Sequence, residues 1–232
     1  AFPAVESALR EPNGLLAVSQ GLQLSQLVDA YRQGIFPWYS EDEPIVWWSP
    51  DPRLVLQPSH FKISRSLRKR IRSICASENV RIELDRSFVK VMHCCAAPRR
   101  GQEGTWITRH VLNAYSQLHD RGLAHSIETW VDGQLVGGLY GVALGRMFYG
   151  ESMFALHPDA SKIALTALVF LLQTQGVALI DCQQETSHLK SLGAQTMSRR
   201  AFCAHVRQAT AQPPIHWQAY QGQDLKTLLT VI

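Results

Sequence analysis

The stretch from residue 125 to residue 183 constrains the fold more than any other part of the sequence. Three runs of residues with high strand propensity are separated there by the turn dipeptides Asp132-Gly133 and Leu144-Gly145. An Asp-Gly pair between two such runs is a strong signal for a β-hairpin. The expected elements, in order, are strands at 125–131, 134–143 and 146–153, a helix at 161–175 and a strand at 177–183.

The first 58 residues differ in composition from the rest of the chain. They hold seven of the eleven prolines and three of the six tryptophans. A helix is expected at 25–33, and the segments 36–39 and 46–50 are expected to be rigid aromatic loops. We therefore expect a small N-terminal domain at 1–58 and a main domain at 59–232.

The order of elements in the main domain, completed by a short helix at 187–192 and a strand at 194–197, resembles the GCN5-related N-acetyltransferase (GNAT) fold. The expected fold class is mixed α+β, with a GNAT-like C-terminal domain. Such a fold says little about chemistry. An acetyl-CoA enzyme of this fold needs a glycine-rich pyrophosphate loop before its long helix. Residues 151–162 contain no glycine and carry Glu151 and Asp159, which disfavours acetyl-CoA as the donor.

Composition narrows the possible cofactors and surroundings. The five cysteines form no C-x-x-C pair, and no Cys/His cluster has zinc-finger spacing. We therefore expect free thiols in a reducing cytoplasm and no zinc-finger site. No apolar run approaches the roughly 20 residues that cross a membrane, so no membrane span is expected. The formal net charge of +4 permits a nucleic-acid partner without indicating one.

The helix expected after Ser64 has one apolar and one basic face. No acidic residue occurs between positions 52 and 77. Such a pattern is ordinarily a solvated helix surface, but the absence of acids makes a phosphate-binding face equally reasonable. The basic face consists of Arg65, Arg68, Lys69 and Arg72.

Asp181 and Gln183 end a strand that is expected to be buried. A carboxylate there is costly unless it is paired or lines a cleft. Asp181 is either a cap of the next turn or a base or electrostatic partner for an amine, with Gln183 as a hydrogen-bonding group. Glu151 ends the neighbouring strand, so the two acids would form a pocket suited to a cation. A Cys182–His188 nucleophile is disfavoured, because strand alternation turns Cys182 away from its neighbours.

Seven sequence blocks lie between residues 36 and 194. They are Phe36-Pro-Trp-Tyr39, Trp47-Trp-Ser-Pro-Asp-Pro-Arg53, Gly104-Thr-Trp-Ile-Thr108, Ala124-His-Ser-Ile-Glu128, Val136-Gly-Gly-Leu-Tyr-Gly141, Gly150-Glu-Ser-Met-Phe154, and Ile180-Asp-Cys-Gln183 with Ser191-Leu-Gly-Ala194. No single block is specific. Together and in this order they closely resemble the leucyl/phenylalanyl-tRNA–protein transferase family.

This resemblance implies an aminoacyltransferase. It would move leucine or phenylalanine, with methionine as a further donor, from tRNA to the N-terminal amine of proteins that begin with Arg or Lys. The product is a destabilising N-terminus read by the bacterial N-end rule (N-degron) pathway of protein degradation. We expect a cytoplasmic monomer whose partners are aminoacyl-tRNA and the acceptor protein. The resemblance also implies that it needs no metal and no other cofactor. The aminoacyl ester is already activated, so orientation, proton removal and oxyanion stabilisation remain for the enzyme.

The resemblance also implies roles for individual residues. Asp181 would act through Gln183, which either attacks covalently or positions the substrates; positioning is preferred because an amide is a poor nucleophile. Glu151 would hold the donor amine, and Thr186 stands where some relatives carry an Asn proposed to donate to the oxyanion. The remaining substrate positions are Trp38 and Trp106 at the terminal adenosine, Tyr31 and Tyr115 nearby, and Leu139, Phe148, Leu168 and Ile180 around the donor side chain. The basic face would hold the tRNA acceptor stem through its phosphates.

Two other functions stay open at this point. One is an acyl-CoA-dependent N-acyltransferase on the same fold, which would bind CoA. The other is a non-catalytic RNA-binding module, in which a change of Asp181 would leave function intact. A related bacterial leucyl transferase for acidic N-termini lacks these sequence blocks.

Overall fold

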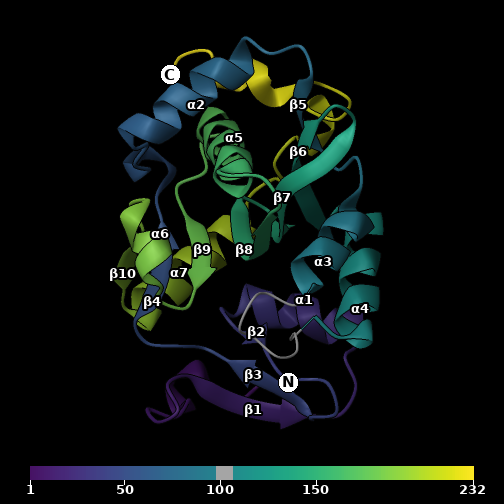
Figure 1. Ribbon diagram of the computed structural model, residues 1–232. Helices are drawn as coiled ribbons and strands as arrows, with labels where there is room; N and C mark the ends of the chain where they lie inside the picture. The colour runs from purple at the N-terminus through teal and green to yellow at the C-terminus, as the bar shows by residue number, and fades with distance from the viewer. Residues whose placement is uncertain (98–106) are drawn as a thin grey trace.

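The computed structural model describes residues 1–97 and 107–232 and is a mixed α+β protein built around two sheets (Figure 1). The large sheet has seven strands in the order β10-β4-β9-β8-β7-β6-β5, and the small sheet has the order β1-β3-β2. The strands are β1 (Leu15–Ser19), β2 (Phe36–Pro37), β3 (Ile45–Trp48), β4 (Arg53–Leu56), β5 (Val80–Leu84), β6 (Ala124–Val131), β7 (Gln134–Leu144), β8 (Met147–Ala155), β9 (Ile180–Gln183) and β10 (Gln195–Met197). The helices are α1 (Leu24–Arg32), α2 (Arg65–Cys75), α3 (Phe88–Ala96), α4 (Arg109–Asp120), α5 (Ala160–Thr174), α6 (Ser187–Ser191) and α7 (Arg199–Thr210). The expected fold class is confirmed.

Strands β6, β7 and β8 form an antiparallel meander with turns at the predicted dipeptides, and β5 pairs antiparallel with β6 at the edge of the sheet. Asp132 and Gly133 both have positive φ, as the common two-residue hairpin turn requires. Strand β9 then pairs parallel with β8, with Asp181 opposite Tyr149, and α5 is the crossover between them. A parallel pair needs a connection of this kind. The order of meander, helix and strand that led to the GNAT-like expectation is therefore confirmed.

Helices cover both faces of the large sheet. On β7, Tyr140 and Val142 belong to a core that includes α1, α3, α4 and α7, whereas Leu139 and Ala143 belong to a second core with α2 and α5. Alternate side chains of one strand thus enter opposite cores. Figure 1 shows α2 and α5 at one end of the molecule and the small sheet at the other. In residues 1–97 and 107–232, no helix has both the length and the apolar character to cross a bilayer.

The segments expected to be aromatic loops are partly strands. Phe36 pairs with Trp48 and Pro37 with Trp47, so 36–37 and 45–48 form β2 and β3. Strand β2 lies at the edge of the small sheet, where a proline costs no internal ladder bond. The expectation of loops was therefore wrong for 36–37 and 46–48, because the prolines argue against a strand and an edge strand tolerates them.

Strand β4 joins the N-terminal part of the chain to the large sheet. It inserts between β9 and β10 and is antiparallel to both. Its four residues are all buried. The division of the chain at residue 58 stays a prediction, and β4 lies on the N-terminal side of it.

Candidate active site

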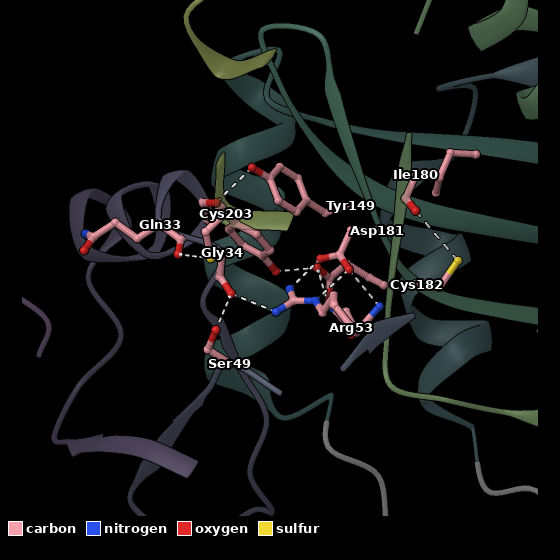
Figure 2. A network of polar contacts seen from close by, with 12 residues as sticks. Gln33, Gly34, Ser49, Arg53, Tyr149, Ile180, Asp181, Cys182 and Cys203 are labelled. Atoms are coloured by element: carbon pink, nitrogen blue, oxygen red, sulfur yellow. Dashed lines mark hydrogen bonds and ion pairs between the residues drawn. The ribbon is translucent and has the colours of Figure 1, made fainter. Parts of the chain in front are cut away.

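Asp181 is completely buried and is paired with Arg53 of β4 (Figure 2). Nε of Arg53 donates to Oδ1 of Asp181 at 2.9 Å, and Nη2 donates to Oδ2 at 2.6 Å. This is the bidentate geometry in which a guanidinium binds a carboxylate most strongly. Asp181 is thus a carboxylate that is fixed in place and whose charge is balanced by Arg53.

The expected pocket between two open acids is therefore not formed as predicted. Asp181 and Glu151 both line the apolar cavity, but Arg53 takes both carboxylate oxygens of Asp181, so Glu151 is the acid with an oxygen left to bind a cation. Arg53 is not among the residues predicted from the sequence. Its only local signal is an arginine at the start of an otherwise apolar segment, 53–56, within one of the family blocks.

Gln183 ends β9 in a left-handed backbone conformation, with a φ of +64°. A residue other than glycine in this region is strained and needs support from its surroundings. Asp181 supplies this support, because its Oδ1 accepts the backbone N–H of Gln183 at 2.8 Å. The side-chain Nε2 of Gln183 donates to Oε1 of Glu151 at 3.1 Å.

Glu151 lies on β8, beside Gln183, and is partly buried. Its Oε1 accepts hydrogen bonds from the Tyr31 hydroxyl and from Gln183. Its Oε2 is buried and has no hydrogen-bond partner among the described residues. Burial raises the pKa of Glu151 to about 8, although the two hydrogen bonds favour the ionised form. A cationic group placed at Oε2 would ionise this carboxyl group and bind to it.

Tyrosines surround the inner side of Glu151. The hydroxyl groups of Tyr31 and Tyr115 lie 2.5 Å apart, and both side chains are fully buried. Tyr149 also holds α1 in place, since its hydroxyl donates to the backbone oxygen of Tyr31 at 2.8 Å. Burial and the nearby Glu151 raise the pKa of Tyr31 well above its ordinary value, which keeps this phenol protonated. Tyr31 and Tyr115 therefore support Glu151 from within the core and are not exposed surfaces for a ligand.

An apolar cavity of about 110 Å³ opens beside Glu151 and Gln183. It lies between the α5 face of the sheet and the end of β9. All four residues predicted to surround the donor side chain line it, namely Leu139, Phe148, Leu168 and Ile180. Leu56, Met153, Leu165 and Leu189 also line it, and these residues were not predicted.

A second, wider cleft of about 350 Å³ adjoins this cavity. Glu151, Gln183, Trp38 and Thr186 all line it, so four predicted residues from distant parts of the chain meet there. Trp38 has 47% of its surface exposed, and its backbone oxygen accepts a hydrogen bond from the Trp48 indole. The Thr186 hydroxyl caps α6 by accepting the backbone N–H of Leu189 at 3.2 Å.

The predicted basic face of α2 is present. Ser64 caps the helix, and Leu67 and Ile71 are buried on its other side. Arg65, Arg68, Lys69 and Arg72 line an open groove of about 720 Å³. Arg70 and Lys162 both approach Asp159, so this acid at the start of α5 is balanced by basic groups.

One predicted residue cannot be placed. Trp106 lies outside the described residues. Cys182 lines the cavity, and burial raises the pKa of its thiol, which makes it a poor nucleophile.

The apolar cavity opens beside the amide of Gln183 and the carboxyl group of Glu151. Such a site can hold an apolar aminoacyl group, which is what an aminoacyltransferase has to bind. The expected class, an aminoacyltransferase, is confirmed by comparison with known proteins. Residues 55–207 match the family model described as leucyl/phenylalanyl-tRNA protein transferase, and residues 22–51 match the model of the N-terminal domain of that transferase. The chain belongs to the leucyl/phenylalanyl-tRNA–protein transferase family.

Individual relatives support the same conclusion. The chain is 58% identical over 221 residues to the leucyl/phenylalanyl-tRNA–protein transferase of Burkholderia vietnamiensis, covering 94% of this chain and 87% of the relative. It is 56% identical, with the same coverage, to that of Burkholderia orbicola. These matches favour the family function over the acyl-CoA and RNA-binding alternatives.

Solved structures give weaker likenesses. The structure of L-PGS from Bacillus licheniformis is 14% identical, with a TM-score of 0.39, over 60% of this chain and 48% of the other. A GCN5-related N-acetyltransferase from Kribbella flavida is 13% identical, with a TM-score of 0.34, over 71% of this chain and 57% of the other. Likenesses this weak carry no argument about function.

Proposed function

We propose that the chain transfers leucine or phenylalanine from aminoacyl-tRNA to the N-terminal α-amine of proteins that begin with Arg or Lys. Methionine is a further donor in this proposal. The product would be a destabilising N-terminus for protein degradation. The observation that carries the proposal is the apolar cavity that opens beside Glu151 and Gln183.

The donor fits this site by its two ends. Its apolar side chain would occupy the cavity between Leu139, Phe148 and Leu168. Its α-ammonium would then lie at the mouth, where the unpartnered Oε2 of Glu151 can accept a hydrogen bond. A charge-assisted bond of this kind is stronger than a neutral one.

The reaction needs no cofactor, because the ester bond to the ribose is already activated. The acceptor amine attacks the ester carbonyl, a C–N bond forms, and the C–O bond to the ribose breaks. The amine loses a proton, and the ribose oxygen gains one. Gln183 would orient the ester and donate to the developing oxyanion, and the exposed Thr186 hydroxyl lies in the same cleft as a second donor.

Asp181 acts indirectly in this proposal. Its carboxylate is occupied by Arg53 and by the backbone N–H of Gln183, so it does not remove the proton from the amine. Instead, it would hold Gln183 in the orientation that the reaction needs. Orientation of this kind contributes to catalysis because reacting groups must meet at about 3–3.5 Å.

The tRNA would lie across two surfaces. Trp38, which is exposed at the cleft, would stack on the terminal adenosine. The groove along Arg65, Arg68, Lys69 and Arg72 would bind phosphates of the acceptor stem. We also propose that the enzyme is a monomer and that it acts in the cytoplasm; the second point is in keeping with five cysteines that are all free.

The direct test uses charged tRNA and a set of short peptides. Labelled Leu-tRNA and Phe-tRNA are supplied with peptides that differ only in the first residue: Arg, Lys, Asp or Ala. We expect transfer to the Arg and Lys peptides and little to the others. Equal transfer to all four peptides would contradict the acceptor specificity, and no transfer to any, with tRNA still charged, would contradict the proposed reaction.

A further inference from the structure

We propose that Arg53 is a positioning residue that holds both polar groups of the site, Gln183 and Glu151, in place. The inference rests on the proposed function, because it concerns the same reaction. Arg53 is fully buried and does not line the apolar cavity or the adjoining cleft. It would therefore act through other residues and never touch the substrates.

Two nitrogens of the Arg53 guanidinium position Gln183 through Asp181. The Nε and Nη2 atoms hold the two oxygens of Asp181, and Oδ1 of Asp181 in turn accepts the backbone N–H of Gln183. The backbone of Gln183 is left-handed, with a φ of +64°, and this conformation needs a fixed partner. If the two hydrogen bonds from Arg53 to Asp181 are lost, Asp181 can rotate, and the side chain of Gln183 loses its orientation toward Glu151.

The third nitrogen of the guanidinium positions Glu151 through α1. This nitrogen, Nη1, donates to the backbone oxygen of Gly34 at 2.8 Å, two residues after the end of α1 (Figure 2). Helix α1 carries Tyr31, and the Tyr31 hydroxyl donates to Oε1 of Glu151. Arg53 thus joins the end of α1 to β9, and the two segments hold the two ends of the Gln183–Glu151 pair.

The packing around the guanidinium makes this connection rigid. The central carbon of the guanidinium lies 4.8 Å from the ring centre of Phe36 and 4.3 Å from that of Phe202. A flat guanidinium fits between two rings and also presents a fork of donors, whereas an ammonium is a point charge on a flexible stem. Lysine at this position would keep the charge but could not hold Asp181 and Gly34 in fixed directions together.

The test is Arg53→Lys, with Arg81→Lys as a matched control. Arg81 also donates from Nε to an acid, Glu83, at 2.6 Å, but its side chain is 47% exposed and belongs to β5, three strands away from β8 in the sheet. Transfer is measured with Leu-tRNA and an Arg peptide, well below the melting temperature of each variant. We expect kcat of Arg53→Lys to fall by about 10- to 100-fold while KM for aminoacyl-tRNA changes by less than about twofold. Arg81→Lys should leave both values unchanged.

A double variant separates positioning from folding. Arg53→Met alone leaves the buried Asp181 without its ion-pair partner, whereas Arg53→Met with Asp181→Leu removes both charges and should recover much of the lost thermal stability. We expect the double variant to remain slow in kcat after its melting temperature has recovered. Recovery of kcat together with stability, or a full kcat in folded Arg53→Lys, overturns the role of Arg53. An inactive wild-type enzyme instead overturns the proposed function.

Discussion

The side-chain amide of Gln183 donates to Oε1 of Glu151 at 3.1 Å and so joins the end of β9 to β8 at the mouth of the apolar cavity. The two residues lie 32 positions apart in the sequence and meet because β8 and β9 are parallel neighbours. Glu151 keeps its other oxygen unpartnered among the described residues. The pair therefore offers one fixed amide and one open carboxyl oxygen to whatever occupies the mouth.

The first prediction concerns Gln183. Gln183→Ala removes the amide that orients the ester and donates to the oxyanion, so kcat should fall by about 10²- to 10³-fold. Gln184→Ala is the matched control, because Gln184 is the exposed neighbour in the same cleft. The kcat of each variant is measured from steady-state transfer of leucine from Leu-tRNA. Equal losses in the two variants would show that the amide of Gln183 has no special role.

The second prediction concerns pH and Glu151. The folded protein holds the Glu151 proton up to a pKa of about 8, whereas the unfolded chain releases it near 4.5. Between these values the folded state binds more protons, so the contribution of Glu151 to stability falls as pH rises from about 4.5 to about 8. Glutamine does not ionise, so Glu151→Gln removes this pH-dependent contribution to stability.

Urea unfolding at a series of pH values measures the difference. The variant should gain stability relative to wild type as pH rises through this window, and the difference should level off above it. Glu128, whose pKa is raised to about 7 mainly by burial, is present in both proteins, so its effect cancels. A difference that stays constant with pH would mean that Glu151 ionises normally in the folded protein.

The third prediction concerns donor selection. Leu168 lines the cavity, whereas Leu172, one turn later on α5, is equally buried and does not line it. Leu168→Val removes one methylene from the wall and should raise the ratio of kcat/KM for Phe-tRNA over Leu-tRNA by about tenfold. Leu172→Val should destabilise the fold by about 1 kcal/mol without changing the ratio. The same ratio in both variants would place the donor side chain elsewhere.

The fourth prediction concerns the basic groove. Phosphate contacts release counterions, so each lost contact lowers the slope of log K against log salt by about 0.7–0.9. Arg65→Ala with Arg68→Ala should therefore weaken tRNA binding and lower the slope by about 1.4–1.8. Arg207→Ala, on the exposed side of α7, should leave the slope unchanged. Filter binding at several salt concentrations tests this, and an unchanged slope in the double variant would move the tRNA site off α2.

The fifth prediction concerns Trp38. Stacking of a base on an aromatic side chain contributes about 1–3 kcal/mol, so Trp38→Ala should raise KM for aminoacyl-tRNA by about 5- to 150-fold. Trp38→Phe keeps an aromatic surface and should lose less. If both variants keep the wild-type KM, the adenosine does not stack on Trp38.

The helices and strands that are bounded by local sequence signals, such as turn dipeptides and helix caps, could be predicted. The turn dipeptides located the meander strands within one or two residues, and Ser64 caps α2 as expected, with its hydroxyl accepting the Leu67 N–H at 3.1 Å. Strand β4 was missed because it has four residues, no hairpin partner and pairing partners more than a hundred residues away. Long-range pairing of this kind leaves no local pattern in the sequence.

The site was predictable in its apolar part and less so in its polar part. Leu139, Phe148, Leu168 and Ile180 line one cavity, in keeping with the family resemblance. The state of Asp181 could not be predicted, because its partner Arg53 comes from β4, a strand that was itself missed. Without that partner, Asp181 appeared in the sequence as an open acid.

The most direct test of the central claim is a crystal structure with a 3′-phenylalanyl-amide of adenosine, which carries the donor end of the tRNA in a form that cannot transfer. We predict the phenyl ring in the cavity between Leu139 and Leu168, with the α-ammonium within hydrogen-bond distance of Oε2 of Glu151. A phenyl ring outside this cavity, or an ammonium far from Glu151, would contradict the account.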